Sequence, residues 1–98
     1  MSSARIVAGD IVFLPVGSVY LPMRAQDLRT HTTEKPYLIR VERVWPSLTR
    51  GASALFWTAN GVEMYAFSTY VEIPSALELL LFFGSGGTLW NDEVSIKR

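Results

Sequence analysis

The sequence predicts a single, mainly β domain, a small barrel over residues 1–98 with at most one short helix near residues 75–83. Three observations support this fold class. Hydrophobic residues make up 49% of the 98 residues and charged residues 18%, as is typical of one folded domain. Short runs of β-branched and aromatic residues alternate with turn residues. An Asn-Gly pair at 60–61 lies between two such runs and indicates a β-hairpin.

The amino-terminal part predicts an interrupted first strand. Two β-rich runs, Arg5–Ala8 and Ile11–Val16, are separated by a Gly-Asp pair at 9–10. Pro15 has no N–H group to donate to a neighbouring strand, so we expect it at an edge or a bulge. A further short run follows at Val19–Pro22.

Residues 23–35, MRAQDLRTHTTEK, form a polar stretch with little apolar periodicity. We expect a long, mobile loop here, with at most a helical turn around Ala25–Leu28. A loop of this length is either functional or a variable insertion, and the sequence leaves both alternatives open.

The next stretch, 34-EKPYLIRVERVWPS-47, predicts a strand with an irregularity in it. Apolar residues alternate from Tyr37 to Val41, as expected for one face of a strand. The following apolar residues, Val44 and Trp45, are out of phase with that alternation. We therefore expect a bulge near Glu42–Arg43 that absorbs the extra residue.

The hairpin around Asn60-Gly61 has a defined register, because a two-residue type I′ turn fixes which residues face each other. The predicted pairs are Ala59 with Val62, Trp57 with Met64, Leu55 with Ala66 and, on the opposite face, Phe56 with Tyr65. One face is then entirely apolar and should pack into the core. It comprises Leu55, Trp57, Ala59, Val62, Met64 and Ala66.

The carboxyl-terminal part predicts a short helix and a short strand. Ser75 and Glu78 have the spacing of a capping box, and Gly84 would end the helix that it begins. Residues 79–83 are apolar on every side and also fit a buried strand, but we favour the helix. A final strand is expected around Glu93–Ile96.

No catalytic, metal or cofactor motif is present in the sequence. The chain has no cysteine, which excludes disulfides and cysteine-ligated zinc. Its one histidine, His31, lies in the polar stretch, without the spacing of a metal site or a catalytic relay. We therefore expect a protein that is not an enzyme, with no catalytic residues, no metal and no cofactor.

The charge balance and hydropathy favour a protein partner over nucleic acid or membrane. Nine basic and nine acidic residues cancel, so no global field attracts a phosphate backbone. The longest apolar run, Leu79–Phe83, is far shorter than the ~18 residues of a membrane span. No apolar segment of a signal peptide precedes Asp10. These features predict an intracellular location.

Several arginines occur between Arg24 and Arg50, and aromatic residues that could form an interface occur along the chain, so a binding surface is expected where the two meet. The candidate binding residues are Tyr37, Arg40, Arg43, Trp45 and Trp57. Trp57 is either a core residue or a site residue; its place on the apolar hairpin face favours the core. Tyr37 is the better site candidate.

Several segments resemble, in order, the opening of a BAH (bromo-adjacent homology) domain. They are 9-GDIVFL-14, 36-PYLIRVERVWPS-47 and 55-LFW-57, with a looser similarity over 78-ELLLFFGSGGTLWNDEVSIKR-98. The resemblance implies a BAH-like barrel, a nuclear location and a role in binding chromatin or histone tails. Tyr37 and Trp57 match two walls of the methyl-lysine cage found in some members. The third wall falls on Ala59, which cannot stack on an ammonium group.

We thus predict a non-enzymatic protein-interaction module that binds a protein or peptide partner. Another SH3-like barrel is the alternative fold. The alternative functions are a small phage or bacterial accessory or inhibitor protein that binds a host protein complex, which would be cytoplasmic, and a nucleic-acid-binding small barrel.

Overall fold

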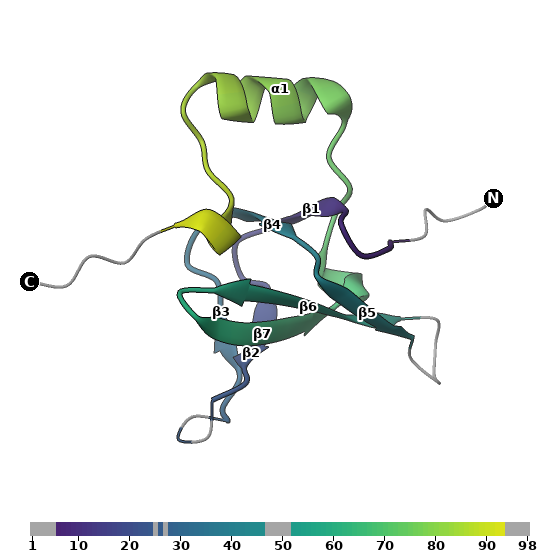
Figure 1. Cartoon of the computed structure of the whole chain (residues 1–98), viewed down its shortest axis with the longest axis vertical. Coiled ribbons are helices and arrows are strands. Elements are labelled where there is room, and N and C mark those ends of the chain that lie inside the picture. The colour runs from purple at the N-terminus through teal and green to yellow at the C-terminus, as the bar shows by residue number, and fades with distance from the viewer. Residues whose placement is uncertain (1–5, 25, 27, 47–51, 94–98) are drawn as a thin grey trace, which may run out of the picture.

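The computed structural model describes residues 6–24, 26, 28–46 and 52–93. These residues form two antiparallel sheets, one α-helix and two 3₁₀ helices, so the mainly β class with one short helix is confirmed (Figure 1). The strands are β1 (Ile11–Leu14), β2 (Val19–Pro22), β3 (His31–Thr32), β4 (Tyr37–Arg40), β5 (Arg43–Pro46), β6 (Ser53–Ala59) and β7 (Val62–Phe67). The helices are η1 (Ser68–Tyr70), α1 (Ala76–Gly84) and η2 (Trp90–Asp92).

The strands hydrogen-bond as two separate sheets among the described residues. β1 pairs with β4 in one sheet, and the other has the order β3-β2-β7-β6-β5. The closed barrel that the sequence predicts is therefore not confirmed.

The chain crosses from one sheet to the other at the predicted irregularity between β4 and β5. The Val41 N–H donates to the Asp10 carbonyl at 2.8 Å, beside β1. The next N–H, of Glu42, donates to the Phe56 carbonyl in β6 at 2.7 Å. The change of phase in the apolar pattern thus marks a change of sheet. β4 and β5 belong to different sheets, and each sheet turns its apolar side towards the core from a different direction.

The hairpin of β6 and β7 has the predicted register at all four pairs. Asn60 and Gly61 have φ values of 55° and 76°, as a type I′ turn requires. The predicted apolar face lies against the core: five of its six residues are buried, and Val62 is half-buried.

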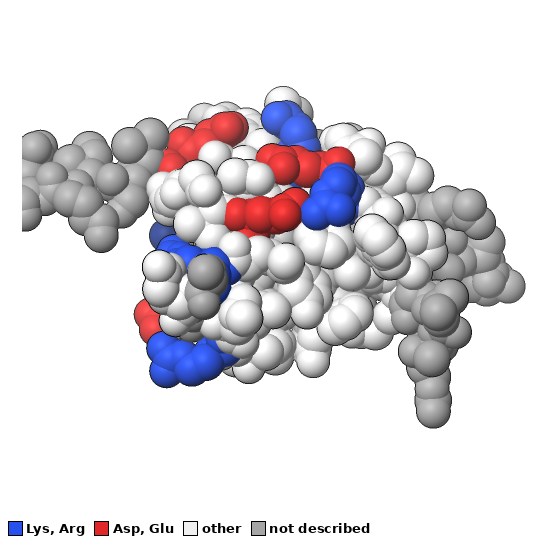
Figure 2. Space-filling view, turned by 60° about the horizontal axis from the view of Figure 1, so that its bottom comes forward, with Lys and Arg blue, Asp and Glu red and all other residues white. Residues whose placement is uncertain are grey.

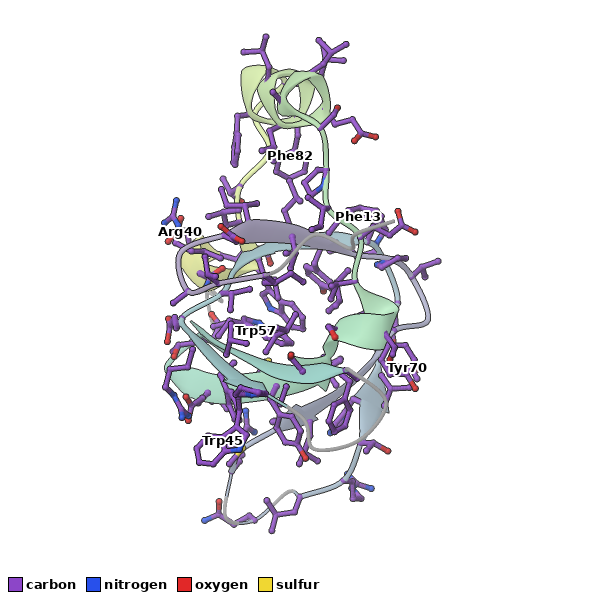
Figure 3. All side chains as sticks on the ribbon, turned by 90° about the vertical axis from the view of Figure 1, so that its right-hand side faces the viewer. Phe13, Arg40, Trp45, Trp57, Tyr70 and Phe82 are labelled. Atoms are coloured by element: carbon purple, nitrogen blue, oxygen red, sulfur yellow. The ribbon has the colours of Figure 1, made fainter. Side chains whose placement is uncertain are left out.

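Trp57 lies at the centre of the core, between the two sheets (Figure 3). It is fully buried, as predicted from the hairpin register. β1 and β4 cover it from one side and β6 and β7 from the other, and Trp90 of η2 adds a second indole. The other buried residues of this cluster are Val12, Leu14, Ile39, Val41, Leu55, Ala59, Met64 and Ala66.

The first strand is shorter than predicted. β1 begins at Ile11 and ends at Leu14, while residues 6–10 form a turn and Arg5 lies outside the described residues. The Asp10 carboxylate accepts a hydrogen bond from the Val7 N–H at 3.0 Å, which favours the turn over a strand. Pro15 lies just after β1, where its missing N–H disturbs no ladder.

The prediction of one loop over residues 23–35 is wrong in part, because β3 lies within it. His31 and Thr32 pair with Tyr20 and Val19 of β2, and the His31 ring stacks on Tyr20 with centroids 5.6 Å apart. The pairing continues at Thr33, whose N–H donates to the Ser18 carbonyl at 2.9 Å. The expected helical turn at Ala25–Leu28 includes Ala25 and Asp27, which lie outside the described residues.

The carboxyl-terminal part confirms the helix and corrects the strand. Ser75 and Glu78 form both bonds of the capping box, at 3.1 and 2.8 Å, and α1 ends at Gly84. Instead of leading into a strand, the chain forms η2 at Trp90–Asp92. Glu93 is extended but unpaired in any described strand, and the rest of the predicted strand, residues 94–96, lies outside the described residues.

Gly61→Val should lower the free energy of unfolding by more than about 1 kcal/mol, because a β-branched residue resists the positive φ at this position. Asn60→Gly is the matched control, since glycine also adopts a positive φ, and it should change stability by less than about 0.5 kcal/mol. Urea unfolding followed by circular dichroism measures both. Equal stability of the two variants would contradict the hairpin.

Candidate interaction surfaces

The five binding residues that the sequence predicts lie in different environments and do not form one site (Figure 3). Trp57 is in the core, and Tyr37 is half-buried beside it. Arg40 is exposed at the end of β4. Arg43 and Trp45 are on β5, at the edge of the five-stranded sheet.

Trp90 packs against both of the residues that the resemblance assigns to a methyl-lysine cage. Its indole stacks on the Tyr37 ring with centroids 4.0 Å apart and lies 5.6 Å from the Trp57 centroid. Tyr20 completes this aromatic cluster, 5.2 Å from Trp90 in an edge-to-face arrangement. The cluster gives η2 a firm attachment to the core.

Asn91 secures the same segment to the end of β4. Its side-chain Oδ1 accepts from the Arg40 N–H at 2.7 Å, and its Nδ2 donates to the Arg40 carbonyl at 3.0 Å. The amide thereby satisfies both backbone groups of Arg40 as a neighbouring strand would. Arg40 thus positions η2 through its backbone, whereas the sequence had suggested a role for its side chain.

The outer face of the five-stranded sheet carries an aromatic surface, which includes two of the predicted residues. Because directly paired residues point to the same side of a sheet, the register places its members together. The surface comprises Arg43, Trp45, Phe56, Tyr65 and Phe67. Trp45 is 64% exposed, and the Phe56 and Tyr65 rings stack with centroids 5.3 Å apart.

Arg43 is neutralised on this surface. Its guanidinium donates to the Glu63 carboxylate at 2.7 Å and lies 4.2 Å from the Phe56 ring centroid. Beside it, Thr58 donates to the Glu42 carboxylate at 2.9 Å. The face in Figure 2 likewise shows basic side chains next to acidic ones, so no broad basic area gathers there.

Helix α1 carries a second, more apolar surface, which sequence reasoning did not identify as a site. Leu77, Leu80 and Leu81 are 62, 68 and 63% exposed. Their i, i+3, i+4 spacing places them on one side of the helix. We call this side the leucine face. Phe82 points the other way, towards the body of the domain (Figure 3).

Helix α1 is exposed because of how it is attached. Figure 1 shows it above the β1–β4 sheet, joined to the body by two extended segments. Before α1, Glu72 exchanges two backbone hydrogen bonds with Phe13, both of 2.8 Å. After it, the chain returns to buried Leu89 and Trp90. None of the described helix residues is buried.

The leucine face had a signal in the sequence. A helix that is apolar on every side is normally buried in a large core or a membrane, whereas none of the described residues of α1 is buried. No described helix is long and apolar enough to cross a membrane. The surplus of apolar residues in 76–83 was therefore the feature of the sequence that could have drawn attention to this face.

No group of three or more His, Asp or Glu side chains among the described residues is arranged to hold a metal ion. His31 stacks on Tyr20, a contact between β3 and β2. Comparison of the chain with protein-family models, characterised proteins and solved structures found no match.

Trp57→Ala should lower the free energy of unfolding by about 3–5 kcal/mol, because it leaves a large cavity in the core. Trp57→Phe should lower the free energy of unfolding by clearly less, since an aromatic ring remains. It also removes the buried indole N–H, which has no hydrogen-bond partner among the described residues. Tyr37→Phe should be nearly neutral, because the stacking on Trp90 is retained. Chemical denaturation compares the three. A folded, stable Trp57→Ala protein would contradict the core assignment.

Proposed function

We propose that the protein is a non-enzymatic interaction module that inserts the leucine face of α1 into an apolar groove on a protein partner. The single observation that carries this proposal is the exposure of Leu77, Leu80 and Leu81, each above 60%, on one side of a short helix. Helix-in-groove recognition uses apolar anchors at this i, i+3, i+4 spacing.

The helix is prepared for binding before the partner arrives. The capping box satisfies backbone groups at its first turn, and both ends are attached to the body of the domain. A free peptide of nine residues would not form a stable helix in water. Presenting it preformed avoids the ordering entropy that a disordered segment loses when it binds.

A protein groove fits the leucine face better than a membrane surface does. Helices that lie on membranes combine an apolar face with Lys or Arg on the polar face. Helix α1 contains no Lys or Arg, and its one charged residue is Glu78. An anionic lipid surface would repel this charge, whereas an apolar groove on a protein does not require a basic helix.

Nucleic acid is the weaker alternative. The aromatic sheet surface with Trp45 and Phe67 resembles a stacking platform, but such platforms combine aromatic rings with a positively charged groove. Arg43, the basic residue among these rings, is paired with Glu63. This surface better suits an auxiliary contact with the same protein partner.

The kind of partner differs between the predicted roles: a host protein complex for an accessory protein, and chromatin or a histone tail for a BAH-like domain. A phage or bacterial accessory protein that binds a host complex would use a compact apolar anchor of this kind. The chromatin and histone-tail roles, with a nuclear location, rest on the resemblance to BAH domains and remain predictions. The full burial of Trp57 gives methyl-lysine reading no support in this conformation.

We also propose that the two sheets make up a small barrel of the SH3-like kind. The support is the passage of the chain from one sheet to the other at Val41–Glu42, with Trp57 enclosed between them. Strands that change sheets at corners are typical of orthogonally packed small β folds.

Leu80→Glu should weaken partner binding at least about tenfold, because it places a charge in the centre of an apolar contact. Leu28→Glu is the matched control: Leu28 is 65% exposed and lies in the polar stretch before β3, away from α1. A photo-crosslinking residue at position 80 or 28 identifies the partner in cells. Calorimetry with the purified partner then compares the two Glu variants with the unaltered chain.

Both variants should remain folded, since neither position is buried. Crosslinks at position 80 to a protein whose binding Leu80→Glu weakens, and Leu28→Glu does not, support the proposal. Crosslinks only to lipid, only to a second copy of the chain, or equally from both positions contradict it.

A further inference from the structure

A pocket of about 250 Å³ lies between α1 and the β1–β4 sheet. Its walls are mainly apolar: Phe13 of β1, Leu38 of β4 and Phe82 of α1 face it, and Ile73 and Pro74 line it from the segment before the helix. The volume equals that of roughly eight water molecules in the liquid. It lies just below the range of pockets for drug-sized ligands, so it suits a smaller molecule.

The wall on the helix side, Phe82, lies close to a glycine. The Gly87 N–H donates to the Phe82 carbonyl at 2.9 Å. A Cβ atom at position 87 would lie 2.6 Å from the Phe82 ring, so only glycine lets the ring lie this close. Phe82 thus forms the wall of the pocket on the helix side, with its ring close to Gly87.

Two carboxylates give the pocket a negative character. Glu72 and Glu78 both line it, and no Lys, Arg or His is among its lining residues. The backbone pairing with Phe13 fixes the position of Glu72. The capping box fixes the Glu78 side chain, whose Oε1 accepts from the Ser75 N–H at 2.8 Å. The backbone of Glu72 and the carboxylate of Glu78 are thus both fixed beside an apolar pocket.

An aromatic ring beside these carboxylates already has a cation near it. Tyr37 lines the pocket, and the Lys35 ammonium lies 5.3 Å from its ring centroid. Lys35, like Glu72 and Glu78, is exposed and screened by water, and a ligand ammonium can take over its place beside the ring.

We propose that this pocket binds a small amphiphilic amine, in which one apolar ring or short branched chain carries an ammonium group. The apolar part fills the space between Phe13, Leu38 and Phe82, where burial removes it from water. The ammonium pairs with Glu72 and Glu78 at the rim. A carboxylic acid of the same shape is repelled, and a neutral analogue gains only the apolar contact.

This site goes beyond the partner-binding role and does not depend on it. The leucine face points away from the body, and Leu77, Leu80 and Leu81 are not among the residues that line the pocket. Failure of one proposal therefore leaves the other intact, and Leu80→Glu should leave amine binding unchanged.

Titration with three probes of one shape tests the charge preference. The probes are 4-phenylbutylamine, 4-phenylbutan-1-ol and 4-phenylbutyric acid, added to the full chain and followed by the NMR shifts of its backbone amides. The amine should bind at least about threefold more tightly than the alcohol, and the acid more weakly than both. The shifts should centre on Leu38, Ile73 and Phe82.

Two conservative variants isolate the charge. Glu72→Gln and Glu78→Gln keep the side-chain shape, and glutamine also completes a capping box, so α1 should persist. Each should reduce the preference for the amine over the alcohol while leaving the affinity for the alcohol unchanged. Asp92→Asn, on η2 outside the pocket, is the control and should change neither.

Equal binding of all three probes overturns the proposal. So does an amine preference that persists in both glutamine variants, or shifts that centre on the aromatic sheet surface. Loss of alcohol binding in the glutamine variants would likewise contradict the proposal. The glutamates would then maintain the structure of the pocket and not attract the ammonium group.

Discussion

The enclosure of Trp57 between two sheets is the constraint on which the rest of the structure depends. In a domain of 98 residues one fully buried indole accounts for a large part of the core, and four strands and η2 converge on it. Because the amino-terminal β1, the central β4 and the carboxyl-terminal Trp90 all contact this cluster, segments far apart in the chain are held together there.

This core also explains why α1 is exposed. Trp90, and no residue of α1, packs against Tyr20, Tyr37 and Trp57 in the core. The chain on either side of the helix is fixed, by the Glu72–Phe13 pairing and by the bonds of Asn91 to Arg40. A short apolar helix between two such attachments is held near the body without being able to enter it, so Leu77, Leu80 and Leu81 face solvent.

The aromatic sheet surface, the leucine face and the pocket differ in how charged residues are distributed on them. On the sheet, acidic and basic groups neutralise each other, as Arg43 and Glu63 do, and leave a mixed aromatic face. Around α1 the outward side carries no charge, and the side towards the body has the two carboxylates of the pocket. A chain with a net charge of zero thus presents an apolar surface on one side of a single helix and, on the other, a mainly apolar pocket lined also by two glutamates.

Local chemistry in the sequence determined the hairpin, the capping box and the apolar hairpin face that carries Trp57. Each depends on residues close together in the chain: Asn60-Gly61 sets a turn and its register, and Ser75 with Glu78 starts a helix. Contacts between distant segments decided what the sequence left open. Strand β3 exists because β2 offers it partners, and the phase break at Val41–Glu42 became a passage between sheets.

The candidate surfaces were the least predictable part. Arginine and aromatic content singled out Tyr37, Arg40, Arg43, Trp45 and Trp57, but the fold distributed them among the core, a strand end and a sheet face. Sequence patterns report which side of its own element a residue occupies. Whether that side meets another element or solvent depends on which distant segment packs against it, and here Trp90 packs into the core while α1 does not.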